Sequence, residues 1–288
     1  MAKLNFFKTT ILLFCAVISV GYSQNKKVKK KVTAIDLSHW TLTVPEEDAD
    51  NPGKPMNIGY PKILNYGNIK GVKEYMYEDP KDKSIVFYAY PSGTATANSR
   101  YSRSELRETM VVGDDNVNWT FAQGGRLKGV FSIADISKDP DGKYSRTIIA
   151  QIHGRLTNEQ RDLIGQNDNN AAPILKIYWD KGKIRVKTKV VKDVNASYQE
   201  LLPATAWGDD EGKNFKEKVD FNKFNIEIKV SNGRMEVILN NAESFVYDDL
   251  SVKKWGIFEN YFKAGNYLQS RIPNSFAKVK IHALEVSH

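Results

Sequence analysis

The stretch YFKAGNYLQ, residues 261–269, alternates polar and apolar side chains along the chain. Successive side chains of a β-strand point to opposite faces of the sheet, so this run predicts a strand with two unlike faces. One face would carry Tyr261, Lys263, Gly265, Tyr267 and Gln269. The other would carry Phe262, Ala264 and Leu268, with Asn266 among them. A half-buried strand with a solvated face gives this pattern, and so does a strand whose polar face takes part in chemistry.

Period-two alternation recurs along most of the chain after residue 33. It is visible in runs such as SIVFYAY, TIIAQIHG, KIRVKTKVV and KVKIHALEVS. Turn sequences separate the runs, including DKGK after Trp179 and SNGR after Val230. The sequence has no long helical pattern and no internal repeat. Short alternating strands with Gly, Asn and Asp turns predict an all-β fold, an antiparallel β-sandwich of the jelly-roll type.

The first 23 residues have the organisation of a secretory signal peptide. Lys3 and Lys8 supply positive charge, TTILLFCAVISV is the apolar core, and Gly21 and Ser23 are small residues suited to cleavage. The apolar run is too short to span a membrane, although an uncleaved amphipathic anchor is an alternative. We therefore expect a protein without a membrane span, secreted to the periplasm or the extracellular space.

The positive charge of the chain is concentrated near its start. The formal net charge is +8, and seven lysines precede Val32: Lys3, Lys8 and five between residues 26 and 31. The chain from Val32 onward therefore carries a formal charge of about +1. We interpret residues 24–32 as a basic linker and residues 33–288 as one domain. The charge gives no support to a nucleic-acid partner, and we expect a monomer.

The number and spacing of the cysteine and histidine residues argue against a metal enzyme. The only cysteine, Cys15, lies in the signal segment, so no disulfide is expected in the mature chain. The four histidines are His39, His153, His282 and His288. No two of them have the close spacing of a zinc site. We predict catalysis without a metal ion or any other cofactor.

A second polar run, YSRSELRE, places charged residues at every second position. Arg103, Glu105 and Arg107 would share one face of a strand. An ion ladder on an exposed face is one interpretation. The other is a carboxylate-binding site, in which the glutamate holds both guanidinium groups in the orientation that a carboxylate needs.

The short run QIH gives a third polar face. Gln151 and His153 would point to one side of a strand, and Ile152 would point to the core. A single histidine on a strand is more often structural than catalytic, so this run has little weight by itself.

The three runs together suggest one polar surface and one type of chemistry. That surface would hold Arg103, Glu105, Arg107, Gln151, His153, Lys263, Tyr267 and Gln269. A glycoside hydrolase normally needs two carboxylic acids, whereas this face has one glutamate held by arginines. Arginine and amide donors that neutralise a uronate carboxylate would stabilise the charge that develops when the neighbouring C5 proton is removed. A histidine or tyrosine can remove that proton, and a tyrosine can protonate the leaving oxygen.

RSELRE, QIH and YFKAGNYLQ, in this order, resemble the three signature strands of polysaccharide lyase family 7, the alginate lyases. LSHWTLTVP, residues 37–45, is similar to the usual opening of that domain. The resemblance covers essentially the whole chain after the basic tail. It implies a β-jelly roll with a concave substrate groove and an anionic polysaccharide, alginate, as the partner.

The resemblance also implies roles for individual residues. The catalytic centre would consist of Arg103, Gln151, His153 and Tyr267. Arg103 and Gln151 would neutralise the C5 carboxylate, and Tyr267 would give a proton to the leaving oxygen. His153 would be the base for guluronate, whereas Tyr267 would serve as both base and acid for mannuronate. Four further residues would position the substrate or support the site: Glu105, Arg107, Lys263 and Gln269. Tyr261 matches a substrate-binding position too, with packing as an equal alternative.

The expected reaction is β-elimination at the 1,4-glycosidic bond of alginate, which leaves a 4,5-unsaturated uronate at the new non-reducing end. Within the family, QIH tends to accompany activity on guluronate-containing blocks, which favours guluronate here. GNYLQ departs from the common GVYNQ, but Asn266 and Leu268 should point away from the groove. The alternative function is a non-catalytic jelly-roll protein that binds an anionic polysaccharide.

Two long segments and one basic strand leave the extent of the groove open. The segments are residues 155–173 and 193–220, and such segments on a sheet scaffold often cover a site. The basic strand face would carry Lys183, Arg185, Lys187 and Lys189. It either extends a groove for an anionic polymer or is ordinary solvated surface.

Overall fold

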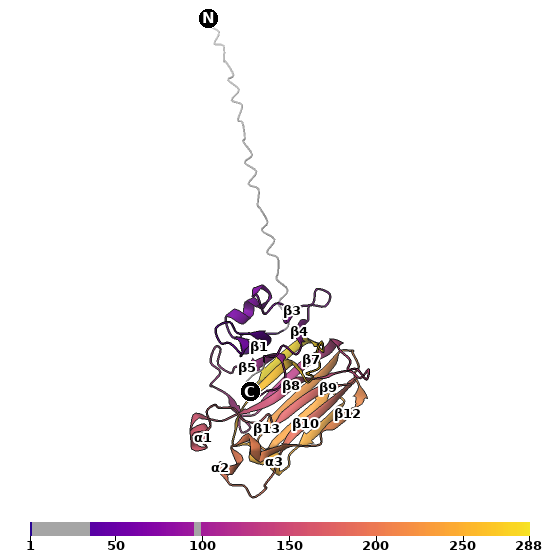
Figure 1. Cartoon of the computed structure of the whole chain (residues 1–288). Coiled ribbons are helices and arrows are strands. Elements are labelled where there is room, and N and C mark those ends of the chain that lie inside the picture. The colour runs from indigo at the N-terminus through magenta and orange to yellow at the C-terminus, as the bar shows by residue number, and fades with distance from the viewer. Residues whose placement is uncertain (2–34, 95–98) are drawn as a thin grey trace. The chain divides into compact units, whose positions relative to one another are not determined.

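Two antiparallel sheets stack face to face in the computed structural model, which describes Met1, residues 35–94 and residues 99–288. Contacts group Thr33–His288 as one unit (Figure 1). The proposed signal peptide, apart from Met1, and the basic linker lie outside the described residues. Every pairing between the named strands of the described residues is antiparallel. The predicted all-β sandwich is therefore confirmed.

The larger sheet holds the three polar runs at its centre. Its spatial order is β11 (Trp207–Asp209), β10 (Lys183–Val191), β9 (Leu175–Asp180), β8 (Arg146–Arg155), β16 (Glu259–Leu268), β5 (Arg103–Glu108), β1 (Trp40–Glu47) and β2 (Pro55–Ile58). Two further strands, β12 (Lys213–Lys218) and β6 (Trp119–Thr120), pair with β10 and β16. RSELRE, QIH and YFKAGNYL thus lie on the adjacent strands β5, β8 and β16.

The smaller sheet covers the apolar face of the larger one. Its order is β15 (Glu243–Tyr247), β14 (Arg234–Leu239), β13 (Phe224–Ser231), β7 (Gly125–Ile136), β17 (Ala277–Ser287), β4 (Ile85–Ala89) and β3 (Met76–Glu78). Phe262, Ala264 and Leu268 of β16 are fully buried between the sheets, as alternation predicts. Burial of such side chains is the main stabilising contribution to the sandwich.

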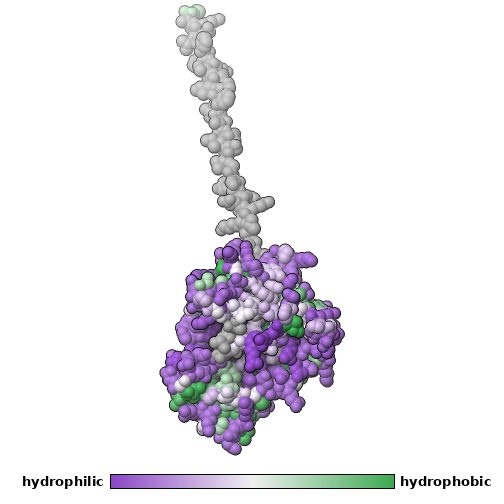
Figure 2. Space-filling view, in the orientation of Figure 1, coloured by the Kyte–Doolittle hydropathy of each residue, from purple (hydrophilic) through white to green (hydrophobic). Residues whose placement is uncertain are grey.

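The helices are short and lie at the edges of the sheets. They are α1 (Asn158–Leu163), α2 (Tyr198–Leu201), α3 (Leu250–Trp255) and the 3-10 helices η1 (Lys62–Asn68) and η2 (Ala204–Ala206). Figure 1 shows α1, α2 and α3 at one end of the sheets, and Figure 2 shows hydrophobic residues gathered at that end of a mostly hydrophilic surface. Within the described part of the chain, no helix has the length and apolar character needed to cross a membrane.

Part of the long segment 193–220 is strand rather than loop. β11 and β12 lie within it and pair with β10. The polar composition of this region hid the strands, because KNFKEK buries only Phe215. The other segment, 155–173, contains α1, whose first turn is closed by a capping box between Thr157 and Gln160.

Gly265 and Asn266 fix β16 against β5 and against the opposite sheet. Gly265 has a φ of 143°, and a Cβ atom there would stand 2.7 Å from the carbonyl oxygen of Ser104. A side chain is therefore excluded at this position. The fully buried amide of Asn266 donates to the carbonyl oxygens of Phe87 and Ala277 at 3.0 and 2.6 Å. Asn266 thus points away from the polar face, as predicted, and joins the two sheets.

Glu108, the last residue of RSELRE, faces the core and ties β5 to β16. Its carboxylate accepts from the Trp119 indole at 3.0 Å and from the backbone N–H of Phe262 at 2.9 Å. His288 donates to the other oxygen at 2.7 Å. Burial lowers the pKa of His288, but the hydrogen bond and charge of Glu108 outweigh it and raise that pKa. The register between β5 and β16 is therefore held by buried polar contacts as well as by the ladder.

Candidate active site

The pairing register of β5, β16 and β8 brings the predicted residues to one face. Lys263 lies between Arg107 on one side and Gln151 on the other. Tyr267 lies opposite Arg103, and Tyr261 lies opposite His153. Three runs that are far apart in the sequence thus form one continuous polar surface.

This surface forms one wall of a cavity of about 850 Å³. Eight of the nine predicted site residues line it: Arg103, Arg107, Gln151, His153, Tyr261, Lys263, Tyr267 and Gln269. The ninth, Glu105, lies beneath them and is fully buried. The structure thus assembles the whole predicted set around one cavity, and the role of each member remains a proposal.

Glu105 organises the residues above it and has no exposure through which to bind a substrate. Its carboxylate accepts from Gln151 Nε2 at 2.6 Å and from Arg103 Nη1 at 3.1 Å, and it pairs with Lys263 Nζ at 2.6 Å. Burial would raise the pKa of Glu105, but the charges of Lys263 and Arg103 outweigh it, so the pKa is lowered. Of the two predicted roles, substrate positioning or support of the site, the full burial of Glu105 favours support, because the buried anion orients Arg103 and Gln151.

Arg107 is not the second cation on Glu105, which corrects the sequence interpretation. Its guanidinium donates to the carbonyl oxygens of Glu108 and Asp115 at 2.9 and 2.7 Å, and to Asn118 Oδ1 at 3.1 Å. It also lies 4.2 Å from the centroid of the Tyr261 ring. Spacing along β5 could not show that Lys263 on β16 would take the place next to Glu105. Arg107 instead holds the turn that follows β5.

His153 is held as a neutral imidazole with one nitrogen available. Nδ1 lies 2.9 Å from the carbonyl oxygen of Gly154, which can only accept, so Nδ1 carries the proton and Nε2 keeps its lone pair. The ring stacks on Tyr261 with centroids 5.2 Å apart. Burial, followed by the positive charge of Lys263, lowers the pKa of His153 to about 3. An imidazole in this state can accept a proton at neutral pH.

Tyr267 is fixed by contacts on its ring and on its hydroxyl. The Arg103 guanidinium lies 3.9 Å from the ring centroid, and Tyr101 approaches edge-on with centroids 6.3 Å apart. The hydroxyl oxygen is 2.7 Å from Ser99 Oγ. A phenol that faces the cavity beside a guanidinium is suited to proton transfer in either direction. Gln269, directly after the same strand, donates from Nε2 to the carbonyl oxygen of Tyr267 at 3.2 Å.

The basic strand face, for which groove and solvated surface were both open, contributes one residue to the cavity. Of the face that carries Lys183, Arg185, Lys187 and Lys189, only Lys189 lines the cavity. Lys176 and Tyr178 of β9 join it there, and sequence reasoning missed both. Their signal was present in the alternation of LKIYWD, but the pairing of β9 with β8 was needed to place them. Asp209 pairs with Lys189 at 2.8 Å and with Lys176 at 3.0 Å.

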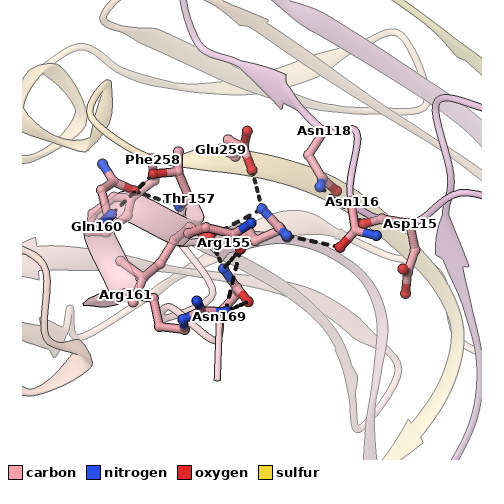
Figure 3. Close-up of polar contacts among 12 residues, drawn as sticks. Asp115, Asn116, Asn118, Arg155, Thr157, Gln160, Arg161, Asn169, Phe258 and Glu259 are labelled. Carbon is pink, nitrogen blue, oxygen red and sulfur yellow. Dashed lines mark hydrogen bonds and ion pairs between the residues drawn. The ribbon is translucent and has the colours of Figure 1, made fainter. Parts of the chain in front are cut away.

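The segment 155–173 forms a wall of the cavity, as expected of a long segment beside a site. Residues 168–173 line the cavity, and the second segment, 193–220, contributes Ala204. Figure 3 shows how Arg155 anchors this wall. Its guanidinium donates to Glu259 Oε2 at 2.6 Å, to the carbonyl oxygen of Leu156 at 3.2 Å and to Asn116 Oδ1 at 3.2 Å. One arginine thus connects the start of segment 155–173 to β16 and to the turn that follows β5.

We expect Arg155→Met to destabilise the domain by about 3 kcal/mol, because it leaves the carboxylate of Glu259 without its partner in a partly buried position. Urea unfolding followed by circular dichroism measures the change. The double variant Arg155→Met/Glu259→Met should lose less free energy of unfolding than the two single variants lose together. Strict additivity would show that the pair makes no coupled contribution.

No three His, Cys, Asp or Glu residues within residues 35–94 and 99–288 are grouped so that they could hold a metal ion. Asp168 is the only acidic residue that lines the cavity in the described part of the chain. The site therefore offers a carboxylate clamp, a neutral imidazole and a phenol. An enzyme that removes a proton next to a carboxylate needs these groups, and a lyase of uronate polymers is such an enzyme.

Comparisons with known proteins indicate the same class of enzyme, a polysaccharide lyase. A family profile described as alginate lyase matches residues 35–288, and the chain belongs to that family. An alginate lyase from Klebsiella pneumoniae is 26% identical over 301 residues, with 88% of this chain and 89% of that protein covered. The predicted family and the predicted polysaccharide lyase class are confirmed.

Solved structures agree with the fold. Alginate lyase A1-II′, a member of polysaccharide lyase family 7, superimposes with a TM-score of 0.68 at 29% identity, covering 88% of this chain and 96% of that one. An alginate lyase from Pseudomonas aeruginosa gives a TM-score of 0.64 at 25% identity and covers 88% and 100%. A variant of A1-II′, with a histidine changed to asparagine and a tyrosine to phenylalanine, is in complex with the substrate GGMG; it gives 0.66 at 28% identity and covers 88% and 94%.

Proposed function

We propose that this alginate lyase is secreted and that it cleaves the 1,4-glycosidic bond of guluronate-containing blocks by β-elimination. One observation carries the proposal: a neutral imidazole and a phenol face one cavity beside an arginine and an amide that a buried glutamate orients. The bound polymer would lie across β8, β16 and β5.

The electrostatic part of the reaction falls to Arg103 and Gln151. Both can donate to the uronate carboxylate, because Glu105 uses only part of their donor capacity. Neutralisation of that carboxylate stabilises the charge that develops on it when the C5–H bond breaks. Lys263 adds a further positive charge at the same place, although burial followed by the charge of Arg103 lowers its pKa to about 8.

The proton transfers are assigned to His153 and Tyr267. For guluronate, Nε2 of His153 takes the C5 proton, the electron pair of that bond forms the C4–C5 double bond, and the C4–O bond breaks. The leaving oxygen takes the proton of the Tyr267 hydroxyl. For mannuronate, Tyr267 serves as base and then as acid. The A1-II′ variant crystallised with GGMG changes the same two residue types, which supports a histidine and a tyrosine as the reacting groups here.

The proposed preference for guluronate blocks has its own basis. It comes from QIH on β8, where Ile152 is fully buried behind the site and does not line the cavity. Its influence on the groove must therefore act through the packing of the strand. Secretion is supported by the charged and apolar organisation of residues 1–23.

The direct test is an assay of the chain from residue 33 with polyguluronate, polymannuronate and mixed alginate, with a chelator present. The unsaturated uronate is followed by its ultraviolet absorbance. A rise that is fastest on polyguluronate supports the proposal. No rise on any block from a folded sample would leave the alternative, a protein that binds anionic polysaccharide without cleaving it. Export is tested separately, by fractionation of cells that express the full chain.

The pH dependence of cleavage provides a further prediction. The pKa of His153 is about 3, so the imidazole stays unprotonated and able to accept a proton throughout pH 5 to 8. We expect kcat/KM on polyguluronate to change less than about twofold between pH 7 and 5. A histidine of ordinary pKa would lose about 25-fold over that range. A loss of that size with a midpoint near 6.5, in enzyme that circular dichroism shows to be folded, would contradict the neutral base.

A further inference from the structure

We propose that Ser99 is a positioning residue for Tyr267: its hydroxyl holds the tyrosine hydroxyl at the cavity and donates a hydrogen bond to it as the phenol gives up its proton. The inference rests on the proposed role of Tyr267 as the acid. Ser99 precedes β5 by four positions and lines the same cavity as Tyr267. Its Oγ lies 2.7 Å from the tyrosine oxygen, the usual length of a hydrogen bond between hydroxyls.

The other contacts of Ser99 leave it able to serve both protonation states of the phenol. Oγ lies 3.0 Å from the carbonyl oxygen of Tyr101, which can only accept, and it accepts from the backbone N–H of Tyr101 at 3.2 Å. A serine hydroxyl has one proton and two lone pairs. While Tyr267 keeps its proton and donates to Ser99, the serine proton goes to the Tyr101 carbonyl and every group is satisfied.

The direction of the hydrogen bond between Ser99 and Tyr267 reverses when the tyrosine hydroxyl donates to the substrate instead. The Tyr267 proton then points to the leaving oxygen, and the serine proton rotates from the Tyr101 carbonyl to the phenol oxygen. As the tyrosine proton moves to the leaving group, Ser99 donates to a developing phenolate, and hydrogen bonds to charged acceptors are the stronger ones. Ser99 keeps its own proton throughout, so the proton that the leaving oxygen takes still comes from Tyr267.

The ring contacts of Tyr267 show why the hydroxyl needs this support. Arg103 and Tyr101 fix the plane of the ring from its face and its edge. Neither contact touches the hydroxyl, so neither selects which of its two directions in the ring plane the phenolic O–H bond takes. Ser99 supplies that directional contact from a different segment, 168 residues away in the chain. A turn-forming serine would need only the Tyr101 contacts.

The test compares Ser99→Ala and Ser99→Thr with the wild-type enzyme on alginate, by ultraviolet absorbance. We expect Ser99→Ala to lower kcat by about 10- to 100-fold, since it removes a hydrogen bond to a developing charge, and to change KM less than about threefold. Ser99→Thr keeps the hydroxyl and should restore kcat to within about threefold of wild type.

Ser92→Ala is the matched control. Ser92 lies in the same region and contacts Ser102 Oγ at 3.1 Å and Thr94 Oγ1 at 2.7 Å, away from Tyr267. It should leave kcat unchanged. A Ser99→Ala enzyme with wild-type kcat, a loss no greater than that of Ser92→Ala, or a loss that threonine does not restore would each overturn the inference. If thermal unfolding shows that the Ser99→Ala variant is not folded, Ser99→Cys is measured in its place, because a thiol is only a weak donor.

The two proposals fail in distinguishable ways. A wild-type enzyme that cleaves no alginate would remove the proposed function and, with it, the basis of this inference. A wild-type enzyme that cleaves alginate, together with a fully active Ser99→Ala variant, would overturn the role of Ser99 alone.

Discussion

Replacement of Tyr267 by phenylalanine should lower the turnover of alginate by about 10³-fold or more while the polymer still binds. The lost hydroxyl is the proposed acid for both types of block and the base for one, and a positioned acid or base contributes about 10²- to 10⁴-fold. The ring contacts with Arg103 and Tyr101 do not involve the hydroxyl, so the shape of the groove should be preserved. Initial rates by ultraviolet absorbance and binding by calorimetry measure the two effects separately.

Tyr178→Phe provides the control for this prediction. Tyr178 lines the same cavity from β9, and burial raises the pKa of its hydroxyl to about 12, which keeps it protonated. It has no assigned role, and the variant should cleave within about threefold of the wild-type rate. A Tyr267→Phe enzyme with wild-type rates would remove Tyr267 as the acid. If Tyr178→Phe were the inactive variant instead, the acid would have to be sought on β9.

The sequence predicted which residues share a face but not which of them touch. Alternation showed which side chains share a face within each of β5, β8 and β16, because side-chain direction in a strand follows from parity. The pairing of these three strands then places Arg103, Gln151 and Tyr267 on one surface. The partners of Glu105 depend on register between strands, which parity does not determine. Gly265 lies opposite Glu105 and has no side chain there, and Lys263 takes the contact that spacing had given to Arg107.

The remaining features of the site arise where the chain leaves the regular strands. Arg155 ends β8 and reaches Asn116 in a turn that no periodicity describes. Ser99 meets Tyr267 only because the segment before β5 passes the end of β16. Such contacts depend on the path of a loop in three dimensions, and loop composition carries little information about that path. Similarly, β12 was hidden because an edge strand of lysine and glutamate has a single buried residue.

Replacement of His153 by asparagine should separate the two types of block. Asparagine can keep a donor near the carbonyl oxygen of Gly154, but its amide is not a base. We expect cleavage of polyguluronate to fall by about 10²- to 10³-fold, the contribution of one positioned base. Cleavage of polymannuronate should fall less than about tenfold, because Tyr267 is the proposed base there. The ratio of the two initial rates measures the effect and is independent of the fraction of active enzyme.

His39→Asn is the matched control, because His39 also lies with Nδ1 near a backbone carbonyl, that of Thr109 at 3.1 Å, and does not line the active-site cavity. It should leave both rates unchanged. Equal losses on the two substrates in His153→Asn would mean that His153 supports the site in general, for instance through its stacking on Tyr261. A larger loss on polymannuronate would reverse the assignment of the bases. A loss that is much larger on guluronate linkages than on mannuronate linkages fits an imidazole that takes the C5 proton from one of the two epimers.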